Sequence, residues 1–127
     1  MLKRSLAVLF AGAICLAAGT AIAEGDADKG EKVFRKCKAC HQVGENAKNR
    51  VGPALNGVVG RNLGANPDYK YSKGLLAMKD KVWDEALLDA YLEKPKDVIK
   101  GTKMAFAGLK KEDERQDVIA YLKQFSN

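Results

Sequence analysis

The 127-residue sequence is poor in the side chains that bind transition metals: it has one histidine, three cysteines and three methionines. A structural zinc site needs about four cysteine or histidine ligands. Beyond the N-terminal segment only Cys37, Cys40 and His41 remain, which argues against zinc. The sequence also lacks internal repeats, low-complexity tracts and any segment that alternates as a strand does. Its length supports one domain, so a multidomain enzyme and a polytopic membrane protein are excluded.

The one long apolar run lies at the N-terminus. A Lys-Arg pair precedes apolar residues 6–18, and the segment ends in Thr-Ala-Ile-Ala. A basic start, about a dozen apolar residues and a small-residue ending are typical of a secretory signal. We therefore expect residues 1–23 to be a signal peptide, cleaved after Ala23. Residues 24–127 would then form one exported domain, periplasmic in a bacterium.

Two other readings of this segment are less favoured. Its apolar length approaches the ~20 residues of a membrane anchor, but helical patterning begins within three residues of Ala23, which leaves no tether. Cys15 could carry a lipid, but the bulky Ile14 stands where such signals have a small residue. We expect no stable membrane insertion.

Three segments repeat apolar residues with helical spacing. Asp26 can cap the first helix, whose stripe is Ala27, Gly30, Val33, Phe34 and Cys37. Asp84 can cap the second, with Trp83 and Leu88 placed as a hydrophobic staple and Pro95 at its end. The third spans residues 111–125, with the stripe Val118, Tyr121, Leu122 and Phe125. A short helix is also expected within residues 72–81.

Glycine and proline interrupt every periodic run between residues 42 and 67, and residues 95–108 also read as a loop. The predicted class is therefore all-α, with an unusually large irregular fraction. Gly30 falls in the buried stripe of the first helix, where it would permit a close helix crossing. The few large apolar side chains form too small a core to stabilise a domain of this size without a covalent cross-link or a cofactor.

Residues 37–41 read Cys-Lys-Ala-Cys-His. In the motif C-x-x-C-H, two thiols add across the vinyl groups of haem and the next residue binds the iron. One helical turn separates the two sulfurs suitably for two vinyl groups. The competing interpretations are a thioredoxin-like dithiol, a zinc site and a plain disulfide. A thioredoxin-like dithiol would need a strand–helix context that is absent here.

His41 is the single histidine, so the chain cannot supply a second axial imidazole. Met78 and Met104 are the remaining soft ligands. Met78 lies among apolar neighbours, as a core methionine does. Met104 lies in a glycine-containing loop that could present its thioether to the far face of a haem, so the spacing favours Met104 and leaves Met78 as the alternative.

The chain resembles class I cytochromes c, most closely the bacterial cytochrome c2 group and mitochondrial cytochrome c. The resemblance covers residues 26–125 and rests on specific motifs: Gly30 with Phe34 before CKACH, Gly52-Pro53, Gly60-Arg61, Trp83, YLEKP at 91–95, GTKM at 101–104 and IAYL at 119–122. It implies a small all-α class I fold, with helices and long loops wrapped around one covalent haem c and with crossing N- and C-terminal helices. It also implies His41 and Met104 as the axial ligands.

The resemblance further implies a pocket in which each residue has a role. The Pro53 carbonyl would accept from His41 Nδ1, and Tyr91 would reach the Met104 sulfur. Tyr71 and Trp83 would hydrogen-bond the haem propionates, and Arg61 would lie nearby and offset their charge. Thr102 would reach a propionate or a buried water. The spacing from Tyr71 to Trp83 is one residue longer than in the mitochondrial form, so no propionate contact is assigned within residues 72–81.

An iron with both axial positions filled has no site for dioxygen or peroxide, so we expect an electron-transfer protein and not an enzyme. The resemblance implies a soluble, monomeric one-electron carrier. It would shuttle between a quinol-oxidising cytochrome bc complex and a photosynthetic reaction centre or terminal oxidase. A haem-binding sensor, or a docked subunit of a larger redox enzyme, is the alternative.

The net charge of +6 comes without a nucleic-acid-binding motif, so a nucleic-acid partner is not expected. The resemblance instead implies that basic residues form a ring around the exposed haem edge, as they do at these positions in the family. This ring would face acidic surfaces of redox partners. The residues of this ring are Lys36, Arg50, Lys96, Lys103, Lys110 and Lys111.

Overall fold

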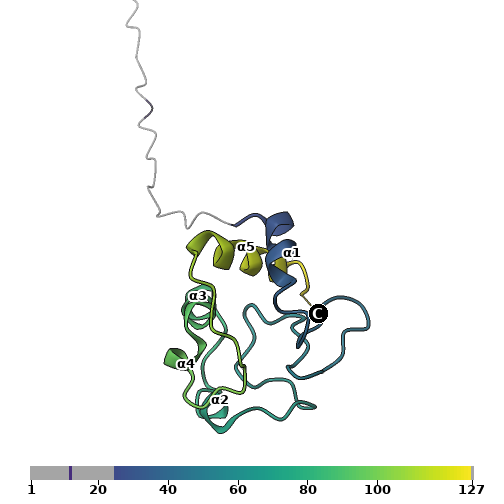
Figure 1. Cartoon of the computed structure of the whole chain (residues 1–127), viewed down its shortest axis with the longest axis vertical. Helices are drawn as coiled ribbons and strands as arrows, with labels where there is room; N and C mark the ends of the chain where they lie inside the picture. Colours follow the sequence, from purple (N-terminus) through teal and green to yellow (C-terminus); the bar gives the residue numbers. More distant parts are fainter. Residues whose placement is uncertain (1–11, 13–24, 127) are drawn as a thin grey trace, which may run out of the picture.

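Within residues 25–126 the regular structure consists of five helices joined by long loops (Figure 1). They are α1 (Ala27–Phe34), α2 (Lys73–Leu76), α3 (Glu85–Glu93), α4 (Pro95–Val98) and α5 (Glu112–Lys123). The computed structural model describes residue 12 and residues 25–126. The predicted signal peptide, its cleavage after Ala23 and the alternative at Cys15 lie outside these residues.

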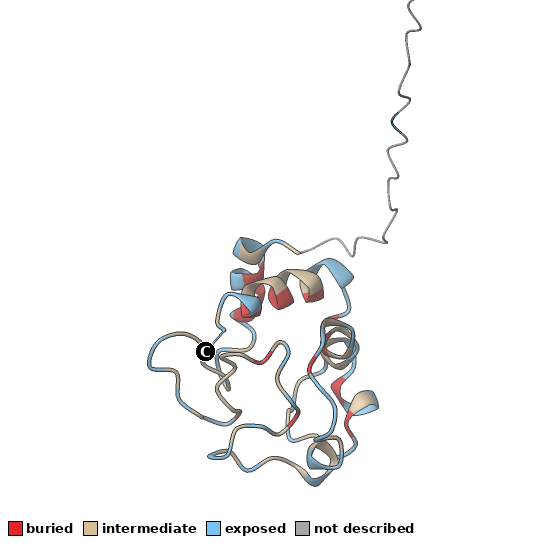
Figure 2. Ribbon diagram, turned by 180° about the vertical axis from the view of Figure 1, so that it is seen from behind, coloured by how far each residue is buried: buried red, intermediate tan, exposed pale blue. Residues whose placement is uncertain are grey.

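The first and last helices cross, as predicted, and Figure 2 shows buried residues on both of them. A Cβ on Gly30 would clash with the Asp117 carbonyl and would lie 2.8 Å from Tyr121 Cβ. The crossing therefore requires glycine, which confirms the prediction of a close approach. Phe34 packs on Tyr121 beside it, with ring centroids 5.4 Å apart.

Local signals place the helix ends. The Asp26 carboxylate accepts from the backbone of Asp28 at 2.9 Å, and the Asp84 carboxylate accepts from Leu87 at 2.7 Å. Both are N-cap bonds that satisfy otherwise unpaired amides of the first turn. Pro95 ends α3 as predicted, with Lys94 before it in an extended conformation.

The prediction of an uninterrupted loop over residues 95–108 was wrong, because α4 occupies Pro95–Val98. Proline fits the first turn of a helix, where its missing N–H costs nothing, so the residue that stops α3 also starts α4. In α5 the predicted stripe is buried at Val118 and Leu122. Ile119 and Arg115, which were not predicted, are buried as well.

Residues 42–67 contain no helix or strand, as predicted, apart from one isolated bridge between Asn62 and Val82. Loop contacts hold them in place. The Asn66 amide donates to Asn49 Oδ1 at 2.8 Å, and Asn49 Oδ1 also accepts from the Ala54 backbone at 2.9 Å. The loops therefore close one side of the molecule while the helices close the other (Figure 1).

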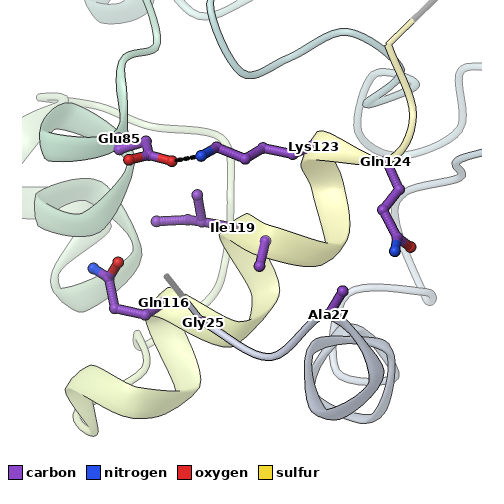
Figure 3. A pocket seen from close by; sticks show the side chains of 8 residues that line it. Gly25, Ala27, Glu85, Gln116, Ile119, Lys123 and Gln124 are labelled. Carbon is purple, nitrogen blue, oxygen red and sulfur yellow. Dashed lines mark ion pairs between the residues drawn. The ribbon is translucent and has the colours of Figure 1, made fainter. Parts of the chain in front are cut away.

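A small surface hollow of about 300 Å³ lies where α3, α5 and the start of α1 meet (Figure 3). Lys123 and Glu85 form an ion pair at its edge, and Ile119 lines its floor. None of the helices among the described residues has the length and hydropathy needed to cross a bilayer.

Candidate functional site

A larger cavity of about 360 Å³ lies between the helices and the loops. Its walls come from the turn after α1, the loops before α2, helices α3 and α5, and the segment between α4 and α5. Apolar side chains dominate the lining, including Phe34, Leu55, Val58, Leu75, Leu88, Leu92, Phe106, Val118 and Leu122. The cavity also contains the four residues singled out from the sequence: Cys37, Cys40, His41 and Met104.

The two cysteines occupy one turn that continues from the end of α1. The backbone amides of Cys40 and His41 both donate to the Cys37 carbonyl, at 3.1 Å and 2.9 Å. Both thiols are free and half-buried. Burial raises the pKa of the Cys37 thiol to about 11, so it is neutral near pH 7. A redox-active dithiol needs a lowered thiol pKa, so the burial of Cys37 acts against thioredoxin-like reactivity.

His41 is held by two neighbours from the following loop. Its Nδ1 lies 2.7 Å from the Pro53 carbonyl, an acceptor that requires Nδ1 to carry the proton. Burial lowers the pKa of His41, an effect that the bond to Pro53 partly opposes. The neutral ring therefore keeps a lone pair on Nε2, the form that binds a metal.

Gly52 lies against the face of the same ring. A Cβ at this position would lie 2.7 Å from His41 Nδ1 and 2.8 Å from Nε2, far inside van der Waals contact. The Gly52 amide also donates to the Cys40 carbonyl at 2.9 Å. The Gly52-Pro53 pair thus fixes both the plane and the tautomer of the imidazole.

Met104 lies in the segment between α4 and α5, and its backbone amide donates to Thr102 Oγ1 at 3.2 Å. The Tyr91 hydroxyl is 3.0 Å from Thr102 Oγ1 and 3.9 Å from Met104 Sδ. Thr102 therefore engages Tyr91 and the Met104 backbone. Met78, the alternative ligand, packs against the apolar core and does not line the cavity.

Arg61 presents an unpaired donor at the cavity. Its Nη1 donates to the Asn56 carbonyl at 2.9 Å and its Nη2 to the Ala54 carbonyl at 3.5 Å. Its Nε is buried and has no partner among the described residues. A buried donor left unpaired costs about 1–3 kcal/mol, so an acceptor that reached this atom would stabilise the structure.

Tyr71 and Trp83, the other predicted propionate contacts, also line the cavity. The Tyr71 oxygen accepts from the Asn66 backbone at 3.1 Å, which leaves its hydroxyl proton available. Trp83 is 6% exposed, and its ring lies 5.0 Å from that of Tyr91.

The structure brings two of the six predicted docking residues to the cavity, Lys36 and Lys103, and both are exposed. Lys36 lies 3.7 Å from Glu114, and Lys103 donates to the Lys70 carbonyl at 2.8 Å. The other four, Arg50, Lys96, Lys110 and Lys111, are exposed but do not line the cavity.

Sequence reasoning missed the closure of the cavity beside His41. The Tyr69 hydroxyl donates to the Val51 carbonyl at 2.6 Å and joins two loops over the ring. The Val51 side chain is 72% exposed at the cavity edge. No periodic signal marks these residues, because irregular segments have no repeating buried face.

Together these features fit a haem. Two thiols in one turn line an apolar cavity that is also lined by a neutral imidazole, a thioether and the Arg61 side chain. No group of three or more His, Cys, Asp and Glu side chains in the described part of the chain could hold a bare metal ion instead.

Comparison with known proteins agrees with this geometry. The family model described as Cytochrome c matches residues 27–126. Cytochrome c2 of Rhodomicrobium vannielii is 50% identical over 121 residues, covering 94% of each chain. Cytochrome c-554 of Methylosinus trichosporium is 48% identical over 125 residues, which is 98% of this chain and 91% of that one.

Solved structures agree as well. Cytochrome c2 from Rhodospirillum centenum superposes with a TM-score of 0.76 at 42% identity, covering 81% of this chain and 100% of that one. Cytochrome cH from Methylobacterium extorquens gives a TM-score of 0.73 at 44% identity, covering 79% of this chain and 99% of that one.

Proposed function

The chain belongs to the cytochrome c family, and we propose that it is a soluble periplasmic carrier of single electrons with histidine–methionine ligation. Family membership makes it an electron-transfer protein with covalently bound haem c, and not an enzyme. Its proposed donor is a quinol-oxidising cytochrome bc complex. Its proposed acceptor is a photosynthetic reaction centre or a terminal oxidase.

We assign the covalent attachment to Cys37 and Cys40 and the axial positions to His41 and Met104. The observation that supports this assignment is that one cavity contains all four, whereas Met78 packs outside it. When bound, haem supplies an iron that gains and loses one electron. A methionine thioether and an apolar surround favour the ferrous state.

The remaining pocket residues prepare this cavity for electron transfer. The Pro53 carbonyl fixes the His41 tautomer, with 2.7 Å between the two atoms. Tyr91 and Thr102 restrain the segment that bears Met104. The Arg61 Nε is available to offset propionate charge. Such fixed groups limit reorganisation when the charge on the iron changes.

The ligand assignment is tested by two variants of the holoprotein. Met104→Ala should abolish the weak absorption band of methionine-bound ferric iron near the red end, lower the midpoint potential and permit peroxidase-like reactivity. Met78→Leu conserves volume and should cost less than about 1.5 kcal/mol of stability, with the band retained. Loss of the band in Met78→Leu alone would reverse the assignment.

We further propose that residues 1–23 are removed during export, so that the mature protein begins at Glu24. N-terminal sequencing of protein recovered from the periplasm tests this step. A chain that retains its first 23 residues, found in the membrane fraction, would favour an anchor instead.

Partner docking is proposed to occur at the cavity edge, where Lys36 and Lys103 lie. Exposed cations there would steer an acidic surface toward the nearest part of the haem and raise the association rate. Because exposed charges are screened beyond about 8 Å at physiological salt, the rate of electron transfer should fall steeply as ionic strength rises.

A further inference from the structure

Among the residues that the structure describes, one charged side chain is buried. It belongs to Arg115, which is 6% exposed. It lies in the first turns of α5 but reaches away from that helix. Its Nε donates to Asp89 Oδ1 on α3 at 2.9 Å. Its Nη1 donates to the carbonyls of Leu109 and Lys110, both at 3.0 Å, and its Nη2 lies 3.8 Å from the Glu93 carboxylate.

These partners belong to two different parts of the fold. Asp89 and Glu93 are on α3, whereas Leu109 and Lys110 end the segment that runs from α4 past α3 to α5 (Figure 1). One guanidinium group therefore connects α5, α3 and the end of that segment. An isolated cation at this depth would be strongly unfavourable, so the two carboxylates make its burial possible.

The same stretch is fixed to α3 by its backbone. The Leu109 amide donates to the Leu92 carbonyl at 2.7 Å, and Leu109 is 2% exposed. Gly108 packs so closely that a Cβ there would clash with the Glu93 carbonyl. Residues 108–110 thus form a fixed arm that begins four residues after Met104.

The other end of the Met104 segment is anchored separately. Ile99 is fully buried, and the Lys100 carbonyl packs so tightly on Gly74 of α2 that no Cβ would fit between them. Met104 therefore lies on a span held at both ends. The later end is held by backbone contacts to α3 and also by the buried side chain of Arg115.

We propose that Arg115 is a positioning residue for Met104: it holds residues 108–110 against α3, and so sets how firmly the thioether is kept in the cavity. The inference rests on the proposed role of Met104 as a ligand. Arginine is required because its planar fork serves acceptors in several directions, whereas a lysine ammonium is a single point charge.

The test compares Arg115→Lys with Ile119→Val in the ferric holoprotein. Ile119 is buried on the same helix but does not line the cavity and makes no side-chain hydrogen bond to the arm, so its truncation weakens the fold without removing a bond that holds residues 108–110. Guanidinium titrations follow two signals, the methionine–iron band and far-ultraviolet circular dichroism. We expect Arg115→Lys to move the midpoint of the band to lower denaturant than that of the helices, and Ile119→Val to move both together.

A second measurement does not depend on the iron ligand. Amide hydrogen exchange at Leu109 should quicken at least tenfold in Arg115→Lys, relative to the exchange of Leu122 on α5. Equal acceleration at both amides, or two coincident midpoints, would reduce Arg115 to an ordinary stabilising residue and overturn the proposal.

Failure of the ligand assignment would look different. If the unaltered holoprotein shows no methionine–iron band while the Leu109 amide still responds to Arg115→Lys, the arm is held as proposed and Met104 is not the ligand. That result would overturn the role of Arg115 toward the iron and retain its role in fixing the arm.

Discussion

Gly52→Ala is the substitution from which the structure predicts the sharpest effect at the site. The new Cβ would lie 2.7 Å from His41 Nδ1 and 2.8 Å from Nε2, whereas ordinary contact begins near 3.4 Å. Either the imidazole or the loop must therefore move by more than half an ångström. Because His41 is tethered through its covalent neighbour Cys40, we expect the loop that contains Pro53 to yield.

The magnitude follows from two costs. Overpacking of a closely packed site costs about 1–3 kcal/mol, and loss of the 2.7 Å bond between His41 Nδ1 and the Pro53 carbonyl adds about 0.5–1.5 kcal/mol. A total of about 1.5–4.5 kcal/mol corresponds to a fall of roughly 6–36 °C in Tm, at about 4–8 °C per kcal/mol for a domain of this size.

Thermal unfolding of the holoprotein, followed by circular dichroism, measures the loss. The neighbouring Val51→Ala is a matched control, because Val51 is 72% exposed and surface truncations usually change stability by less than about 0.5 kcal/mol. In the ferrous protein the Nδ1 proton of His41 should also exchange faster in Gly52→Ala. A Tm equal to that of the control, with an unchanged Nδ1 proton, would refute the packing argument.

Three further predictions concern haem attachment, docking and pH. Replacing Cys37 and Cys40 together by serine should leave little folded protein, because the central cavity loses its filling; a compact apoprotein with a cooperative transition would contradict this. Lys103→Gln should slow electron transfer to an acidic partner more than Lys123→Gln, since Lys103 lines the cavity and Lys123 lies in the hollow at α3 and α5. Equal slowing would mean that only total charge matters. Burial raises the pKa of Tyr121 above its ordinary 10.0, so stability present below about pH 10 is lost as the pH rises through the raised value. Between about pH 8 and pH 11 the free energy of unfolding of the Tyr121→Phe variant should therefore fall by less than that of the unaltered protein. An identical fall in both proteins would mean that Tyr121 is not its source.

The features that could be predicted from the sequence are those determined by residues close to one another along the chain. Asp26 and Asp84 were identified as helix caps because a cap is defined within four residues. The burial of Arg115 was not predicted, because its partners on α3 and in the following segment come together only in three dimensions. The bond from Tyr69 to Val51 was missed for the same reason, since both lie in loops without a repeating face.

The same difference between local and long-range features applies to the residues of the site. Cys37, Cys40 and His41 form a contiguous motif whose chemistry can be read directly from the sequence. The choice of Met104 over Met78 from the sequence depended on loop character and resemblance, and the structure adds that Met104 lines the cavity while Met78 does not. The orphaned Nε of Arg61 could not have been foreseen, because exposure of a loop arginine is the usual outcome.

The crossing of α1 and α5 has a consequence for how the chain reaches its native state. The backbone amide of Asp26 bonds the carboxylate of Asp117, 91 positions later, and the Gly57 amide bonds the Phe125 carbonyl. Closing so long a loop is entropically unfavourable, and these contacts need almost the whole chain to be present. A chain threaded outward from its N-terminus therefore presents both thiols of the attachment motif well before its last helix arrives to seal the core. The attachment motif is thus available for covalent loading before α5 can pack on α1.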